Sequence, residues 1–243
     1  MIQALYSITE NTRLTESVYR MTLQGPTEAL TKPGQFVNIQ LSGKFLRRPI
    51  SVCDWNENGI TLIYKVVGAG TAQMSAMQPN ETLDLLVGLG NGFDVSKSGA
   101  HPLLIGGGVG VPPLYGLCRQ LREAGLPVTV ILGFNTAAEV FYAEEFRALG
   151  AEVIVTTVDG SMGIKGFVTD AMANLDYTYF YTCGPEPMLK AIDRVAVTSG
   201  QLSFEERMGC GFGACMGCSC KTKYGNKRIC KDGPVLEREE IIW

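Results

Sequence analysis

Four cysteines near the C-terminus have the spacing of iron–sulfur ligands. Three follow the pattern Cys-x4-Cys-x2-Cys and a fourth comes further along the chain: Cys210, Cys215, Cys218 and Cys230. Plant-type [2Fe–2S] sites use this spacing. The segment 209–217 is rich in glycine, so it can fold around an inorganic core and direct backbone N–H groups at the sulfides. The pattern therefore predicts a [2Fe–2S] cluster held by these thiolates.

Two alternatives for this cysteine cluster remain open. Cys220 lies two residues after Cys218, on the same face of an extended segment, and competes with Cys230 as the fourth ligand. Short Cys-x2-Cys and Cys-x4-Cys pairs also hold structural zinc, usually as two separate pairs, whereas three of these cysteines crowd one glycine loop. A disulfide framework is disfavoured, because five of the eight cysteines fall within the segment 210–230.

A glycine-rich loop after the apolar run 103–105 is typical of a dinucleotide-binding sheet. Such glycines let the backbone approach a pyrophosphate, and the N-terminus of the next helix favours negative charge. The candidate residues of this loop are Gly106, Gly107, Gly108, Gly110 and Pro112. Ligands of open α/β sheets bind where strands end, and a later strand is followed by a second candidate segment: Cys183, Gly184 and Pro185. Cys183 suits either the core or a position facing a nicotinamide.

The loop after the next strand bears on the choice of nucleotide. Residues 133–136, which follow the apolar run 128–132, contain no Lys or Arg. A 2′-phosphate on the adenosine ribose is usually bound by such a cation. The sequence therefore favours NAD over NADP.

Two segments of the N-terminal region are candidates for flavin contacts. The first is a basic pair that leads into a strand, with the candidate residues Arg48, Pro49, Ile50 and Ser51. The second is a strand end with a loop of small residues that suits close approach of a phosphate, with the candidates Ile63, Tyr64, Lys65, Gly70 and Thr71. Each segment alone also fits a solvated turn, so its interpretation depends on the rest of the chain.

The distribution of apolar residues divides the chain into three regions. Residues 1–98 contain short strands separated by Gly and Pro, which is typical of an antiparallel barrel or sandwich; we expect strands at 35–41, 59–66 and 81–87 and a short helix at 70–77. Residues 99–204 alternate apolar runs with helical segments, which predicts a parallel sheet covered on both faces. The expected strands are 103–105, 128–132, 153–156 and 179–181, and the expected helices are 114–124, 143–149, 167–175 and 187–198. Residues 205–243 are too short for a core of their own.

The composition argues against several other classes of function. The 243-residue chain has 21 Lys and Arg against 24 Asp and Glu, and this near-neutral charge argues against a broad nucleic-acid-binding surface. A His-based metal site or a Ser-His-Asp triad would depend on the one histidine, His101. The N-terminus lacks the pattern of a signal peptide, and the longest uncharged stretch is too rich in Gly and Pro for a spanning helix. We therefore expect a soluble, cytoplasmic protein with no nucleic-acid or membrane partner.

Together these motifs resemble the ferredoxin reductase superfamily over nearly the whole chain. The resemblance implies an antiparallel β-barrel FAD domain over 1–98, a doubly wound α/β NAD domain over 99–204 and a small [2Fe–2S] domain over 205–243. By the same resemblance, Arg48 binds the FAD pyrophosphate and Ser51 lies near flavin N5. The other candidate segments then contact FAD or the nicotinamide nucleotide.

The C-terminal segment narrows this resemblance. The run 204–215, with Cys218 and the stretch 230–235, is similar to the electron-transfer subunits of class 1B dihydroorotate dehydrogenases. In that family an FMN-containing catalytic subunit oxidises dihydroorotate to orotate, and this subunit passes the electrons through its [2Fe–2S] cluster and FAD to NAD⁺. The family assembly is a heterotetramer of two subunits of each kind. Because a nicotinamide exchanges hydride and a cluster exchanges single electrons, FAD must stand between them, and the chain needs no general base.

Two other functions compete with this one. A reductase subunit that serves a hydrogenase or a ferredoxin-linked NADP reductase would share the cofactors and differ in its partner. A zinc-containing, non-catalytic nucleotide-binding module would bind neither flavin nor iron. For the partner surface, a set of basic residues forms either a solvated face or a docking patch: Lys221, Lys223, Lys227, Arg228 and Lys231.

Overall fold

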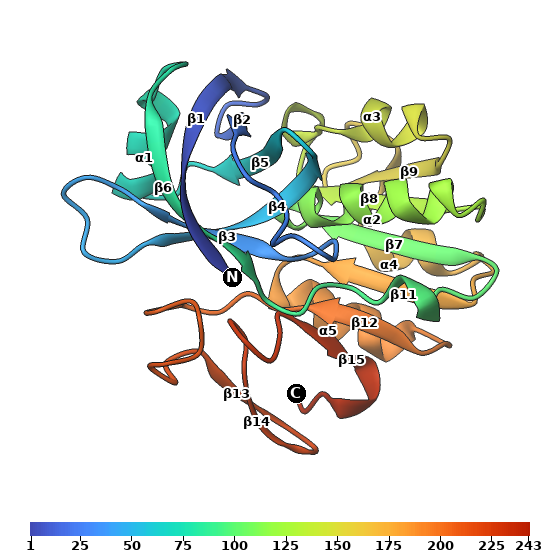
Figure 1. Ribbon diagram of the computed structural model, residues 1–243. Coiled ribbons are helices and arrows are strands. Elements are labelled where there is room, and N and C mark those ends of the chain that lie inside the picture. The colour runs from blue at the N-terminus through green and yellow to red at the C-terminus, as the bar shows by residue number, and fades with distance from the viewer.

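The computed structural model describes all residues from 1 to 243, and its N-terminal part is a closed antiparallel barrel (Figure 1). The barrel strands are β1 (Ile2–Arg13), β2 (Val18–Gln24), β3 (Phe36–Gln40), β4 (Arg48–Asn56), β5 (Gly59–Lys65) and β6 (Thr82–Leu89). Around the barrel they follow the order β1-β2-β5-β4-β3-β6. The structure therefore confirms the barrel and not the sandwich, which was the other expected architecture.

Buried and partly exposed side chains alternate along the barrel strands, and the buried ones form the barrel core. Along β6, Leu83, Leu85 and Val87 are buried in the barrel core and the residues between them are partly exposed. The helix α1 (Ala69–Ala76) lies beside the barrel and contributes Met74 to the same core. The strands expected at 35–41, 59–66 and 81–87 correspond to β3, β5 and β6, and the helix expected at 70–77 corresponds to α1.

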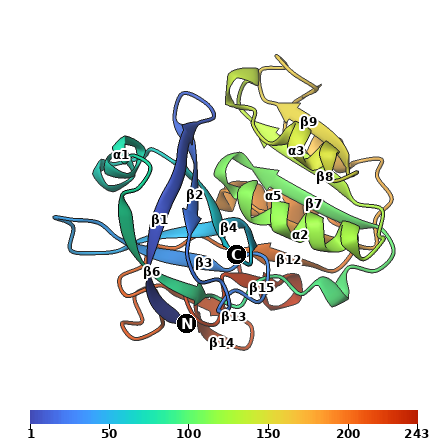
Figure 2. The same ribbon diagram turned by 45° about the horizontal axis from the view of Figure 1, so that its top comes forward.

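The second part is a seven-stranded sheet with helices on both faces (Figures 1 and 2). Its strands are β7 (Pro102–Gly107), β8 (Thr129–Phe134), β9 (Glu152–Thr157), β10 (Ile164–Lys165), β11 (Tyr179–Cys183), β12 (Gly200–Ser203) and β15 (Val235–Glu237). They lie in the order β10-β9-β8-β7-β11-β12-β15, and all pairs are parallel except β12 with β15. The chain reverses its direction across the sheet between β7 and β11, which is the position where such sheets bind ligands.

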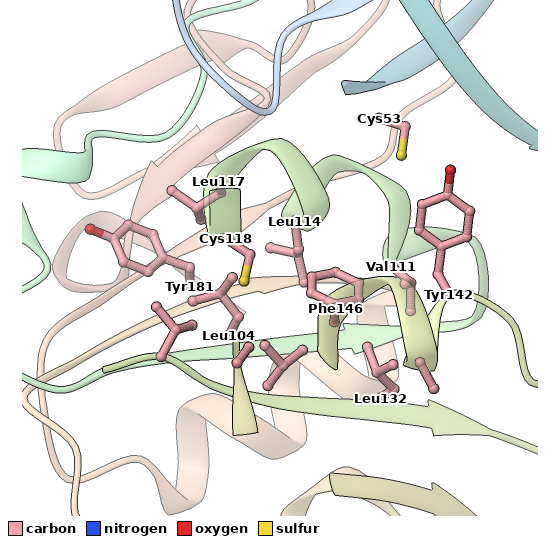
Figure 3. Packing of buried hydrophobic residues seen from close by; sticks show 14 of the residues in the cluster. Cys53, Leu104, Val111, Leu114, Leu117, Cys118, Leu132, Tyr142, Phe146 and Tyr181 are labelled. Carbon is pink, nitrogen blue, oxygen red and sulfur yellow. The ribbon is translucent and has the colours of Figure 1, made fainter. Parts of the chain in front are cut away.

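Alternate residues of the central strands pack on opposite faces of this sheet. Leu104 of β7 packs with helices α2 (Pro112–Glu123) and α3 (Ala143–Ala148), and Figure 3 shows Leu114 and Leu117 of α2 above it. Leu103 and Ile105 belong to the core on the other face, with helices α4 (Val168–Met172) and α5 (Glu186–Val195). This two-sided burial is the reason that the strands read as continuous apolar runs, and the doubly wound fold is confirmed.

Several strands and two helix ends differ from the expectation. No strand was predicted at β1, β2, β13 (Ser219–Thr222) or β14 (Gly225–Arg228). The strands β10, β12 and β15 were also not predicted, because runs of 2, 4 and 3 residues carry no readable period. The helix expected over 187–198 ends at Val195. The helix expected over 167–175 ends at Met172, where the N–H of Leu175 closes a turn onto the Met172 carbonyl. No helix has the length and hydropathy needed to cross a membrane.

The barrel and the sheet share one apolar core. Helix α2 packs along β4, and the Arg119 guanidinium pairs with the Asp54 carboxylate at 2.9 Å. Between them the backbones approach closely, since a Cβ at Gly116 would lie 3.0 Å from the Cys53 carbonyl oxygen. Val18 and Ile63 of the barrel are buried in the same cluster as the residues of α2. The two parts are therefore held in a fixed relation.

The C-terminal segment lies under both parts (Figure 1). It forms a hairpin of β13 (Ser219–Thr222) and β14 (Gly225–Arg228), and then returns as β15 to the edge of the large sheet. Most of its buried apolar residues, among them Cys218 and Cys230, belong to the core that also contains Leu202 of β12. The segment therefore depends on the sheet for its core.

Candidate functional site

The four predicted cluster ligands come together as two pairs. The N–H groups of Ala214 and Cys215 donate to the Cys210 sulfur at 3.3 and 3.4 Å, and the Cys215 thiol lies beside that sulfur. In the other pair, the N–H of Cys230 donates to the Cys218 sulfur at 3.4 Å. A [2Fe–2S] cluster is held by four thiolates, two at each iron. The arrangement suits such a cluster.

Two thiols of this set have shifted pKa values. Burial raises the pKa of the Cys210 thiol, but hydrogen bonds from backbone N–H groups of the loop outweigh burial and lower its pKa to about 6. Burial raises the pKa of the Cys230 thiol to about 12, and the neighbouring Cys218 adds to this rise. The loop N–H groups therefore favour negative charge at Cys210, whereas Cys230 needs the positive charge of a metal to ionise.

Cys220 fits this arrangement less well than Cys230. Cys220 stands in β13 opposite Lys227, packs against the apolar core, and has a pKa raised first by burial and then by Glu206. The described contacts therefore favour Cys230 as the fourth ligand.

The loop around the cysteines is fastened from one side by the turn after β14. Arg228 pairs with Asp232 at 2.9 Å and donates from Nη1 to the Gly213 carbonyl at 3.0 Å. The methylene groups of Lys231 cover Gly213, where a Cβ would lie 2.6 Å from Cδ. The loop conformation is therefore set by tertiary contacts as well as by its glycines.

The predicted flavin segments meet where β4 begins and α1 begins. The Arg48 guanidinium lies against Gly70, where a Cβ would overlap its Nε atom. Thr71 closes the first turn of α1, because its hydroxyl oxygen accepts hydrogen bonds from the N–H groups of Val67 and Gly68 at 2.9 and 3.3 Å. A guanidinium beside a helix N-terminus is suited to an anionic group such as a pyrophosphate.

The strand β5 contributes its candidates differently. Tyr64 is buried inside the barrel core, donates its hydroxyl to Asn11 Oδ1 at 2.9 Å, and has a pKa raised by burial. Ile63 is buried between barrel and sheet, and Lys65 is exposed. Of these three candidates, only Lys65 has a side chain free for a cofactor, so Ile63 and Tyr64 have only their backbone groups to offer.

The predicted nucleotide segments lie side by side at the carboxyl ends of β7 and β11. Gly106 is opposite Cys183 in the parallel register. A Cβ at Gly110 would overlap the Cys183 carbonyl and the Gly184 Cα, so the two loops are in contact. Pro112 begins α2, and Gly108 faces open space. Burial raises the pKa of the Cys183 thiol to about 12, so this thiol stays protonated.

Sequence reasoning missed two features near these sites. Asn38 of β3 is buried and donates from Nδ2 to the Cys210 carbonyl at 3.1 Å. Glu139 and Asp159 follow β8 and β9, and the backbone N–H of Asp159 donates to the Asn135 carbonyl, which joins the two loops. The sequence shows that the loop after β8 lacks basic residues. It does not show that Glu139 and Asp159 follow adjacent strands, because that depends on the order of the strands in the sheet.

The basic segment 221–231 is partly neutralised within the chain. Lys227 pairs with Glu240, which is 5% exposed, and Arg228 pairs with Asp232. Lys223 donates to the Glu239 carbonyl at 2.8 Å. Of the expected basic patch, only Lys221 and Lys231 have side chains without a hydrogen bond or ion pair to the rest of the chain.

Two family profiles match this chain. The first, described as the iron-sulfur cluster binding domain of dihydroorotate dehydrogenase B, matches residues 205–242. The second, described as the oxidoreductase NAD-binding domain, matches residues 104–194. Both matches fall on the parts of the structure that carry the cysteine loop and the glycine loop.

Solved structures share the fold. The chain superposes with a TM-score of 0.90 and 32% identity on an NADH-dependent reduced ferredoxin-NADP oxidoreductase studied for flavin-based electron bifurcation, covering 99% of this chain and 90% of that chain. The ferredoxin reductase of carbazole 1,9a-dioxygenase is similar with a TM-score of 0.69 at 22% identity, over 79% of this chain and 64% of that chain. This second likeness supports the barrel and sheet alone.

Curated relatives cover the chain from end to end. The electron transfer subunit of dihydroorotate dehydrogenase B (NAD(+)) from Geobacillus sp. (strain WCH70) is 43% identical, over 100% of this chain and 99% of its own length. The subunit of the same name from Fusobacterium nucleatum is also 43% identical, over 97% of this chain and 96% of its own length. Identity at this level over the full length means that the chain and these relatives share one architecture. The chain belongs to the family of dihydroorotate dehydrogenase B (NAD(+)) electron transfer subunits.

Proposed function

We propose that the chain carries electrons, by means of FAD and a [2Fe–2S] cluster, between the FMN-containing catalytic subunit of a dihydroorotate dehydrogenase and NAD⁺. The observation that carries the proposal is the contact between the cluster loop and the flavin strand pair, in which Asn38 of β3 holds the Cys210 carbonyl at 3.1 Å. Its cross-strand neighbour is Pro49 of the flavin motif. The relatives at 43% identity bear the corresponding name.

The residues divide the work of holding these groups. The thiolates of Cys210, Cys215, Cys218 and Cys230 hold the cluster, and the N–H groups of the loop stabilise its negative charge. Arg48 and the first turn of α1 hold the pyrophosphate of FAD. When bound, FAD supplies the conversion between hydride transfer and single-electron transfer. The loops after β7 and β11 hold the nicotinamide nucleotide at the switch point of the sheet.

The chain leaves proton transfer on dihydroorotate to its partner. His101 immediately precedes β7, at the amino-terminal edge of the sheet, away from the loops that bind the nucleotide. At those loops, burial keeps the Cys183 thiol protonated by raising its pKa to about 12, so this thiol does not act as a base. The redox groups and their geometry therefore account for the activity of this subunit.

The acids after β8 and β9 support NAD rather than NADP as the nucleotide. Glu139 Oε2 accepts hydrogen bonds from the N–H and Nδ2 of Asn135 at 3.2 and 2.9 Å. Asp159 Oδ1 accepts hydrogen bonds from the N–H and Oγ of Ser161 at 2.9 and 2.6 Å. Two carboxylates at the carboxyl ends of adjacent strands favour a ribose hydroxyl and repel a 2′-phosphate.

The proposal includes three domains and a defined assembly. Residues 1–98 bind FAD, 99–204 bind NAD and 205–243 bind the cluster; the last strand of the barrel ends at Leu89 and β12 ends at Ser203, close to these boundaries. The third domain shares its core with the second through β15. The assembly proposed is two copies of this chain with two catalytic subunits, acting in the cytoplasm on NAD⁺.

A second candidate function is supported by the 32%-identical structure. That protein is an NADH-dependent reduced ferredoxin-NADP oxidoreductase, and its TM-score is 0.90. In that case this chain would use the same kinds of cofactor site but exchange electrons with another partner. The identity of the partner is therefore the property that separates the two functions.

The test is reconstitution with each partner. The chain is co-expressed with an FMN-containing dihydroorotate dehydrogenase subunit, purified without oxygen, and assayed for NAD⁺ reduction by dihydroorotate. We expect a complex whose flavin and iron–sulfur absorption is bleached by NADH and whose NAD⁺ reduction requires both subunits. A chain that binds FAD and iron but exchanges electrons only between NADH and ferredoxin supports the second candidate. A colourless chain that contains zinc contradicts both.

A further inference from the structure

Asn38 is a buried polar residue on the outer face of the barrel, and none of the recognised motifs contains it. It lies in the middle of β3 and is 1% exposed. Its neighbours Val37 and Ile39 belong to the barrel core. Because side chains alternate along a strand, the Asn38 side chain points away from that core.

The strand register places Asn38 on the same face as the flavin motif. In the antiparallel pair of β3 with β4, Asn38 is opposite Pro49 and Phe36 is opposite Ser51. Opposite residues share a face with Cβ atoms about 5 Å apart, and diagonal neighbours are about 7–8 Å apart. Asn38 is therefore a direct neighbour of Pro49 and a diagonal neighbour of Ser51, the residue that we place near the flavin ring.

The cluster loop covers the same side chain. The Nδ2 group of Asn38 donates to the Cys210 carbonyl at 3.1 Å. Gly211 follows with a φ of +79°, and a Cβ at this position would overlap Nδ2. The loop therefore rests directly on the Asn38 amide, and glycine is required both for this contact and for the left-handed backbone.

The other end of the amide has no partner in the chain. Asn38 Oδ1 is buried and accepts no hydrogen bond from any residue. Buried side-chain acceptors in proteins are rarely left without a donor. A donor from outside the polypeptide is therefore expected at this oxygen, on the face where the flavin motif lies.

We propose that Asn38 is a positioning residue that joins the two cofactor sites. Its N–H group holds the Cys210 carbonyl, and its oxygen accepts a hydrogen bond from an N–H or O–H group of the bound flavin. One side chain then sets the position of the first cluster ligand relative to the flavin. This inference rests on the proposed function, because it requires both groups to be present.

Two substitutions separate the two ends of the amide. Asn38→Leu keeps a similar shape and removes both hydrogen bonds, whereas Asn38→Asp keeps the acceptor and loses the donor toward Cys210. We expect Asn38→Leu to weaken FAD binding about tenfold, measured by flavin fluorescence titration, and to change the electron paramagnetic resonance spectrum of the reduced cluster. We expect Asn38→Asp to change only the cluster spectrum. The control is Asn58→Leu in the exposed turn between β4 and β5, which should change neither.

The outcomes distinguish the parts of this proposal. Unchanged FAD affinity together with an unchanged cluster spectrum in Asn38→Leu overturns it. A changed spectrum with unchanged FAD affinity overturns the flavin contact and assigns the donor to water. If Asn38→Leu does not fold, a wild-type cluster spectrum in Asn38→Asp contradicts the contact with Cys210. A wild-type chain that binds no FAD or no iron refutes the proposed function itself, and that failure is visible before any variant is made.

Discussion

The Arg48 guanidinium occupies the space in which a side chain at Gly70 would stand. Arg48 begins β4 and Gly70 is the second residue of α1, so the contact joins the two segments that we assign to the FAD pyrophosphate. Positive charge beside free N–H groups at a helix start is a favourable site for phosphate. The absent Cβ at Gly70 is what allows this approach.

We expect Gly70→Ala to displace the guanidinium and weaken FAD binding about tenfold, as measured by fluorescence titration. The reason is that a charged hydrogen-bond donor moves away from the pyrophosphate while the helix itself gains a favourable alanine. Gln73→Ala, at a half-buried residue of the same helix whose amide donates to the Ser42 carbonyl, is the control. Equal affinities for Gly70→Ala and wild type would show that Arg48 does not act through this position.

The cluster assignment predicts opposite results for two cysteines. We expect Cys230→Ser to lose nearly all bound iron and labile sulfide, because it removes a ligand that lies beside Cys218. We expect Cys220→Ser to keep the cluster, since Cys220 lies against the core in β13. Iron content and the spectrum of the reduced cluster measure both. Loss of the cluster in Cys220→Ser alone would reverse the assignment.

The acids after β8 and β9 predict the nucleotide preference. We expect the double variant Glu139→Gln, Asp159→Asn to raise kcat/KM for NADPH about tenfold with little change for NADH, because two repulsive charges are removed. The aliphatic part of Lys165 lies beside Gly160, so a cation is already present next to the loop that carries Asp159. Glu144→Gln on the exposed side of α3 is the control. An unchanged rate with NADPH would remove these acids from nucleotide selection.

The basic segment predicts two different effects of charge reversal. We expect Lys221→Glu, at an exposed lysine free of ion pairs, to slow association with the catalytic subunit in a salt-dependent way. We expect Lys227→Glu to destabilise the chain by roughly 2 kcal/mol, because it places a second carboxylate beside the buried Glu240. Stopped-flow association and thermal unfolding separate the two effects. Unaltered association kinetics for Lys221→Glu would mean that this face is solvated in the complex.

Glu237 predicts a dependence of stability on pH. Burial raises the pKa of this β15 carboxyl, but hydrogen bonds from Lys97, Gln201 and Tyr179 outweigh burial and hold its pKa below the ordinary value of 4.5. A lowered pKa means that the carboxylate stabilises the fold above pH 4.5 and that this contribution is lost as the pH falls through and below that value.

The matching experiment follows thermal unfolding between about pH 7 and pH 4. We expect Glu237→Gln to be less stable than wild type at neutral pH and to lose less stability on acidification. Glu57→Gln, in an exposed turn, should follow the wild-type curve. Parallel curves for Glu237→Gln and wild type would exclude this carboxyl as a source of the acid sensitivity.

The cysteine loop and several strands could be predicted from the sequence alone, because their signals lie within short segments. The spacing of Cys210, Cys215 and Cys218 in a glycine loop is a property of a short segment, because the loop must wrap one small object. The alternation from 35 to 41 and the apolar runs of the central strands are also local, and they gave β3, β7, β8, β9 and β11. The roles that we propose for Arg48 and Ser51 rest on the family resemblance, because their own surroundings in the sequence do not reveal them.

Only the tertiary structure decided which distant segments touch. The return of β15 to the sheet depends on pairing with β12 and has no local signal, because a strand of 3 residues is too short to show a period. The neutralisation of Lys227 by Glu240 joins residues from the hairpin and the last turn of the chain. The position of Asn38 under Cys210 spans 172 residues of sequence. Such contacts arise from the closure of the barrel and the packing of the C-terminal segment against it, and no short stretch of sequence contains them.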